Sequence, residues 1–99
     1  MQTQSIKILE NNLHHLGFAD VYSFAANQAK LFTYSKIEEY ENKVAFFENK
    51  YHATFKQFEK ELKKKKTENF AKEDDLLEWR FAVEAVSLFE KELKALQKC

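Results

Sequence analysis

The sequence predicts an all-α fold, an elongated antiparallel helical hairpin or bundle of about four helices that includes one long helix. Two observations predict it. The 99 residues include no proline and one glycine, so the residues that tight β-turns require are missing. Apolar residues instead recur every three or four positions along most of the chain. The length fits one domain, residues 1–99, in which an apolar N-terminal segment, 1–34, precedes a helical hairpin core, 35–99.

The first half of the chain predicts a short helix followed by a long one. Apolar residues spaced three or four apart over residues 5–16 predict the first helix, and Gly17 follows where a left-handed cap belongs. From Phe18 to Tyr51 an apolar stripe continues without interruption, with a mean spacing of about 3.7 residues. A helix of this length spans about 50 Å. We expect it either to bend near residues 33–35 or to project beyond a compact domain.

A third, short helix is predicted after residue 51. Thr54 and Gln57 fit a capping box, in which the threonine hydroxyl and the glutamine side chain each accept a hydrogen bond from a backbone amide. The helix should therefore start at about Phe55. We expect it to fold back beside an antiparallel pair formed by residues 37–51 and the last helix.

The last helix is predicted to follow a loop at residues 67–72. The acidic residues 73–75 are expected to cap it, and it should run to about Gln97. Its buried side has a regular, coiled-coil-like spacing. The residues on that side are Trp79, Ala82, Val86, Phe89, Leu93 and Leu96.

The N-terminal segment is apolar on more than one side. Residues 1–34 carry only four charged residues. A helix that packs on its own core with one side cannot bury a second side without another surface. We therefore predict that residues 5–34 form a homodimer interface or the docking surface of a protein partner. In the alternative, the first helix folds back and covers them. The residues outside the main stripe are Val21, Phe24, Leu31, Phe32 and Tyr34.

Charge and cysteine usage narrow the function classes. The 16 basic residues balance the 16 acidic ones, so no net field draws the chain toward nucleic acid or an anionic membrane, and we expect neither as a partner. A single cysteine, Cys99, cannot form an intrachain disulfide, which is typical of a cytoplasmic protein. No apolar run approaches about 18 residues and no signal-peptide pattern is present, so we expect a chain that neither spans a membrane nor is exported.

No catalytic or metal-binding motif is found in the sequence. There is no glycine-rich phosphate loop and no serine, histidine and aspartate set at motif spacing. Adjacent His14 and His15 point about 100° apart on a helix and have no cysteine or carboxylate at ligand spacing. We therefore expect no enzyme, no cofactor and no metal site.

Two charge clusters have alternative interpretations. The carboxylates of residues 73–75 and Glu78 are interpreted as capping residues that match the helix dipole, the alternative being contact with a divalent cation or a basic partner. The lysine run at residues 63–66 is interpreted as a solvated helix end, the alternative being contact with phosphates.

Three stretches of the chain resemble a known protein family. Residues 50–59 read K-Y-H-A-T-F-K-Q-F-E, residues 68–70 read E-N-F and residues 73–79 read E-D-D-L-L-E-W. They are similar to small archaeal and cyanobacterial helical proteins with the pattern K-Y-G-x-S/T-F-x-x-F-E followed by E-D-D-x-x-x-W. These proteins are regarded as antitoxins of the TumA type. The resemblance covers residues 37–97, and His52 stands where the family has glycine.

The resemblance implies a non-catalytic protein-binding module that sequesters a small toxin encoded by a neighbouring gene. It implies framework roles for Tyr51, Phe55, Phe58 and Trp79. Asp74 and Asp75 would be exposed and would contact a basic partner. The alternative function is a self-assembling, dimeric helical structural protein without a toxin partner.

Overall fold

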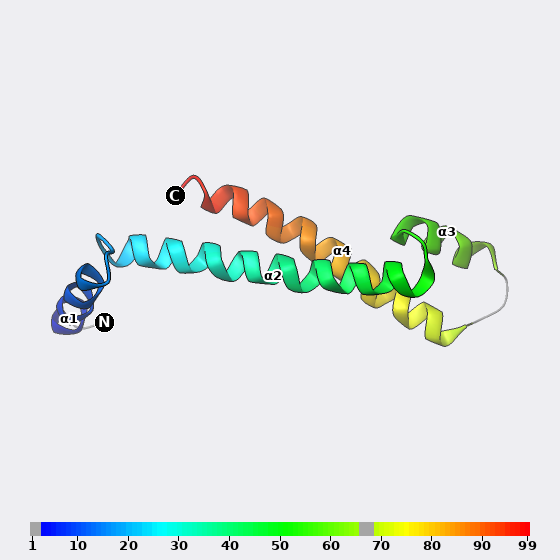
Figure 1. Ribbon diagram of the computed structural model, residues 1–99, viewed down its shortest axis with the longest axis horizontal. Coiled ribbons are helices and arrows are strands. Elements are labelled where there is room, and N and C mark those ends of the chain that lie inside the picture. Colours follow the sequence, from blue (N-terminus) through cyan, green and yellow to red (C-terminus); the bar gives the residue numbers. More distant parts are fainter. Residues whose placement is uncertain (1–2, 66–68) are drawn as a thin grey trace.

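The computed structural model describes residues 3–65 and 69–99, and this part of the chain is all-α (Figure 1). Helices α2 and α4 form an antiparallel hairpin, α3 folds back beside one end of it, and α1 lies at the other end of α2. The predicted fold class is therefore confirmed. The four helices are α1 (Thr3–His15), α2 (Val21–Tyr51), α3 (Phe55–Lys64) and α4 (Phe70–Leu96).

The molecule is a rod. Its extents are 65 × 23 × 19 Å and its radius of gyration is 20.6 Å, against about 13 Å for a compact domain of this length. α2 is one uninterrupted helix through residues 33–35, where the Thr33 hydroxyl donates to the carbonyl oxygen of Ala29 at 2.7 Å. Of the two predicted outcomes, projection is the observed one.

The elongated shape leaves a large surface. The accessible surface is 7761 Å². A compact protein of 11.8 kDa is expected to have about 5,900 Å². The chain therefore exposes roughly 1,850 Å² more than a compact monomer of its mass.

Two helices start at residues other than those predicted, because a side chain caps each of them at a different position. α2 starts at Val21 and not at Phe18, because extended Asp20 accepts a hydrogen bond from the Ser23 amide at 2.7 Å. α4 starts at Phe70, because Asn69 accepts from the Lys72 amide at 3.2 Å.

Residues 73–75 therefore lie inside α4, and the prediction that they supply its cap is wrong, whereas Glu73 does lie in the first turn, where a negative charge matches the helix dipole. Residues 70–72 of the predicted loop belong to α4. Residues 67 and 68 of that loop, and Lys66 of the lysine run, lie outside the described residues.

The predicted start of α3 and the predicted cap of α1 are confirmed. Thr54 accepts from the Gln57 amide at 3.2 Å, and Gln57 accepts from the Thr54 amide at 2.9 Å, so the capping box is complete. Gly17 is left-handed, with φ 95°, just after α1.

An aromatic core forms where α2, α3 and α4 meet. Trp79 is fully buried, and its ring lies 5.6 Å from that of Phe47 and 5.4 Å from that of Phe58. Surrounding this trio are the partly buried residues Val44, Tyr51, Phe55, Leu62, Leu76 and Val83.

The side of α4 that was predicted to be buried becomes more exposed with distance from this core. Trp79 and Ala82 are buried, whereas Val86, Phe89 and the residues beyond are only half-buried. Toward the C-terminal end of α4 only α2 packs against it, and two helices cannot enclose a side chain on all sides.

Truncation of Trp79 is expected to remove the centre of this core. We predict that Trp79→Ala lowers the free energy of unfolding by about 3 to 5 kcal/mol. The matched change Phe32→Ala, at an exposed aromatic residue of α2, should cost less than about 0.5 kcal/mol. Urea unfolding followed by circular dichroism measures both. Equal losses would contradict the described core.

The cap of α2 carries backbone strain. His52 ends α2 in the left-handed region, with φ 51° and ψ 43°, where a β-carbon is unfavourable. We predict that His52→Gly raises the free energy of unfolding by about 1 kcal/mol. His52→Ala is the control, because alanine keeps the β-carbon. If both variants have the same stability in urea, the strain is not the cause.

Candidate protein-binding surfaces

The end of α2 next to α1 is partly covered within the chain. Leu13 of α1 is buried, and the rings of Phe18 and Phe24 meet edge to face at 5.2 Å. Val21 and Phe24 are half-buried. These two predicted interface residues are therefore partly covered by other side chains of the same molecule.

The other three predicted interface residues are exposed. Leu31, Phe32 and Tyr34 keep 55%, 70% and 51% of their surface accessible. They do not form one compact patch, because residues two positions apart on a helix, such as Phe32 and Tyr34, point about 160° apart. Tyr34 faces α4, where its hydroxyl accepts from the Gln97 side chain at 3.4 Å.

Phe46 extends the exposed apolar surface of α2. It follows Phe32 by four helical turns, on approximately the same side, and is also exposed. We call Leu31, Phe32 and Phe46 the α2 surface. Sequence reasoning missed Phe46, although the Phe46–Phe47 pair signals it, because only one of two adjacent helical residues can face the core.

A groove joins the α2 surface to the start of α4. Its volume is about 540 Å³, and Phe46 lies on its wall beside Phe47 of the core. Its remaining walls carry charged and polar side chains of both helices. These are Glu39, Asn42, Lys43, Lys50, Asp75 and Glu78.

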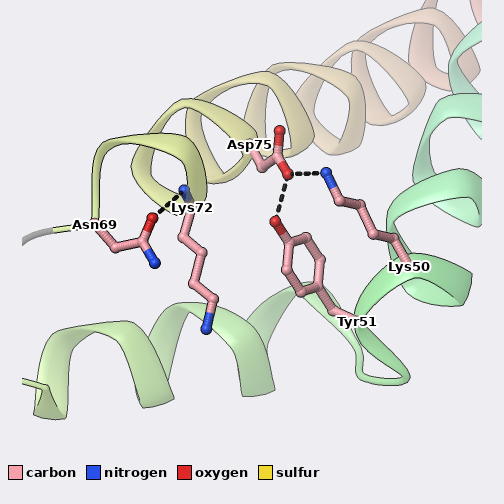
Figure 2. A network of polar contacts seen from close by, with 5 residues as sticks. All are labelled: Lys50, Tyr51, Asn69, Lys72 and Asp75. Atoms are coloured by element: carbon pink, nitrogen blue, oxygen red, sulfur yellow. Dashed lines mark hydrogen bonds and ion pairs between the residues drawn. The ribbon is translucent and has the colours of Figure 1, made fainter.

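Asp75 accepts hydrogen bonds from two other residues of the chain. Its Oδ2 accepts a hydrogen bond from Lys50 Nζ at 2.7 Å and a second from the Tyr51 hydroxyl (Figure 2). Only 18% of its side chain is exposed. The expectation that Asp74 and Asp75 are both exposed is therefore correct for Asp74 and wrong for Asp75.

These contacts shift the titration of the three groups. The hydrogen bonds from Lys50 and then Tyr51 lower the pKa of Asp75. Burial, followed by the hydrogen bond to Asp75, raises the pKa of Tyr51. The hydrogen bond to Asp75 raises the pKa of Lys50. At neutral pH the three groups therefore form a charged clasp between the end of α2 and the first turns of α4.

Two further ion pairs hold the helices together. Arg80 Nη2 lies 2.6 Å from Glu59 Oε2 and joins α4 to α3, which lowers the pKa of Glu59. Lys43 Nζ lies 3.1 Å from Glu78 Oε1 and joins α2 to α4. Of the acidic residues early in α4, Glu73 and Asp74 make no ion pair with the part of the chain that the structure describes.

His14 has a local structural role. His14 Nε2–H donates to the carbonyl oxygen of Ala19 at 2.7 Å and closes the turn between α1 and α2.

Across residues 3–65 and 69–99, no group of three or more histidine, cysteine, aspartate or glutamate side chains is placed to hold a metal ion. None of the helices described is long and apolar enough to cross a membrane.

Sequence reasoning also missed a second apolar stripe, on α4. Leu77, Phe81 and Leu88 are 61%, 59% and 53% exposed, and Phe70 is exposed near the helix start. We call Leu77, Phe81 and Leu88 the α4 outer stripe. Their intervals of four and seven residues are a helical signal, but only the buried stripe of this helix was traced in the sequence.

The charged clasp predicts a pH-dependent stability difference. Because the folded pKa of Asp75 is lowered, its contribution is complete above the unfolded value of about 4 and disappears as the pH falls through the folded pKa. Asp75→Asn should lower the free energy of unfolding by about 1 kcal/mol at pH 7. The difference from the natural chain should shrink below about pH 4.

Urea unfolding of both chains between pH 2.5 and 7 measures this difference. Tyr51→Phe is the control, because it removes one donor and keeps the ion pair with Lys50, so part of the pH dependence should remain. A stability difference that stays constant with pH would contradict the clasp.

Comparisons with family models, with curated proteins and with solved structures find no match to this chain. The resemblance to the TumA-type antitoxins therefore stays a prediction.

Proposed function

We propose that the chain is a non-catalytic protein-binding module that sequesters a small protein partner in the manner of an antitoxin. The observation that carries the proposal is the α2 surface. Leu31 and Phe32 stay exposed although both α1 and α4 pack against α2. Exposed aromatic and leucine side chains grouped on one helix are typical of docking surfaces, where burial of apolar area supplies most of the binding free energy.

The surroundings of the α2 surface favour a partner that is apolar at its centre and basic at its edge. Phe46 borders the groove that also holds Glu39, which is exposed and pairs with Lys36 of the same helix at 3.3 Å. Glu73 and Asp74 are exposed in the first turns of α4. A basic protein would meet these carboxylates without having to break the Lys50–Asp75 clasp.

A rescue experiment tests the proposal. The chain is co-expressed with the product of the neighbouring gene, and we expect the natural sequence to relieve the toxicity of that product. Phe32→Glu should abolish the rescue and raise the Kd of the purified complex more than about tenfold, because it places a charge in the apolar contact. Ser87→Glu, an exposed position on α4, is the matched control and should rescue normally.

The proposal fails if the natural chain gives neither rescue nor a complex. It also fails if Phe32→Glu and Ser87→Glu behave alike, because the α2 surface would then play no part. Circular dichroism of the two variants confirms that they are folded, since both positions are exposed.

The alternative function, a self-assembling helical protein, is favoured by a different surface. That surface is the α4 outer stripe, which lies on a different helix from the α2 surface.

A further inference from the structure

The α4 outer stripe belongs to a longer heptad-like row. Leu77, Phe81 and Leu88 lie about 100 to 140° around the helix from Ala82, whose side chain is fully buried. The same spacing of three and four continues in both directions and includes charged positions. The complete row is Phe70, Asp74, Leu77, Phe81, Glu84, Leu88, Lys91 and Ala95.

We propose that a second copy of the chain docks on this row, so that α4 pairs antiparallel with α4 of the partner about a two-fold axis between positions 82 and 83. The partner is thus the chain itself. The inference goes beyond the proposed function, because its apolar contacts lie on α4 and not on the α2 surface, and because it does not depend on a toxin. Glu73 and Asp74, which the proposed function places against a basic partner, pair here with lysines of the second copy.

The row is complementary to itself in this register. Leu77 faces the partner's Leu88, and Phe70 faces the partner's Ala95, so apolar residues meet apolar residues. Asp74 faces the partner's Lys91, which pairs opposite charges. Because the two-fold axis repeats each contact, every one of these pairs occurs twice.

Residues beside the row and residues at its centre also fit this register. Glu73 and the partner's Lys94 lie opposite each other along one edge of the row. At the centre Phe81 faces the partner's Glu84, whose methylene groups can cover the ring while the carboxylate reaches solvent.

Two other arrangements place like charges together. In a parallel pair each residue faces its own copy, so Asp74, Glu84 and Lys91 would each oppose an identical charge. An antiparallel pair shifted by one heptad toward the helix start places Asp74 opposite the partner's Glu84. Of these three arrangements, only the antiparallel pair about positions 82 and 83 pairs opposite charges, Asp74 with Lys91.

The chain has enough exposed surface for a stable dimer. Over its whole length it exposes roughly 1,850 Å² more than a compact monomer, and a standard interface buries about 800 Å² of each partner. The row from Phe70 to Ala95 is about 39 Å long, which is enough for a continuous helix pair. Beside it, Tyr40 and Phe89 line a shallow hollow of about 270 Å³ into which side chains of the second copy can pack.

Sedimentation equilibrium of the purified full chain, without any toxin, tests the interface. We expect the natural chain to be a dimer at 10 μM, and Leu77→Glu to raise the dimer Kd more than about 100-fold. Phe32→Glu is the control and should remain dimeric, because the α2 surface is not in this interface. A monomeric natural chain at 100 μM overturns the proposal, and so does dissociation by Phe32→Glu but not by Leu77→Glu.

Disulfide cross-linking tests the register. In a Cys99→Ser background, the double variant Leu77→Cys with Leu88→Cys should form a cross-linked dimer on mild oxidation. Each single variant should not, because identical positions lie about 16 Å apart along an antiparallel pair with this axis. Equal cross-linking of the single and double variants indicates a parallel pair and overturns the proposal.

These outcomes are separate from those of the rescue experiment. If the natural chain forms the dimer but does not rescue, only the proposed function is contradicted. A monomer that still rescues removes only the interface on α4.

Discussion

A pair of packed helices can bury only one side of each helix, and this constraint shapes the whole molecule. α2 and α4 pair along most of their length, while α1 and α3 are each long enough to cover only one end. The middle of the rod therefore leaves apolar side chains of both long helices in solvent, among them Phe32 on α2 and Leu88 on α4.

The one place that escapes the constraint is the end that α3 covers. There a third helix encloses Trp79, and the aromatic core and the two ion-paired contacts of Asp75 and Arg80 lie around it. The indole nitrogen of Trp79 has no hydrogen-bond partner among the described residues, which costs about 1 to 3 kcal/mol and must be offset by the packing of the ring. Stability is thus concentrated at one end, and the exposed apolar surfaces extend away from it.

The fold class, the helix order and the capping box at Thr54 could be predicted from the sequence because they depend on local spacing and chemistry. Helix starts depend on which side chain reaches a free amide, and the sequence does not show this. At α4, Asn69 is the cap although three acidic residues follow it. The exposure of Asp75 could not be predicted, since its two donors come from a helix more than 20 residues away in sequence. Phe46 and the α4 outer stripe were within reach, because their spacing is helical. They lie beyond the predictions because a second apolar side is predicted only for residues 1–34, although the later part of the chain carries one as well.

The slender shape also determines how the chain moves through water. A body 65 Å long and about 20 Å wide experiences more friction than a sphere of the same mass. Its Stokes radius is correspondingly large, so a single copy leaves a gel-filtration column earlier than globular standards of 11.8 kDa. Retention volume alone would therefore overstate the number of subunits, and light scattering at the column outlet gives the mass independently of shape.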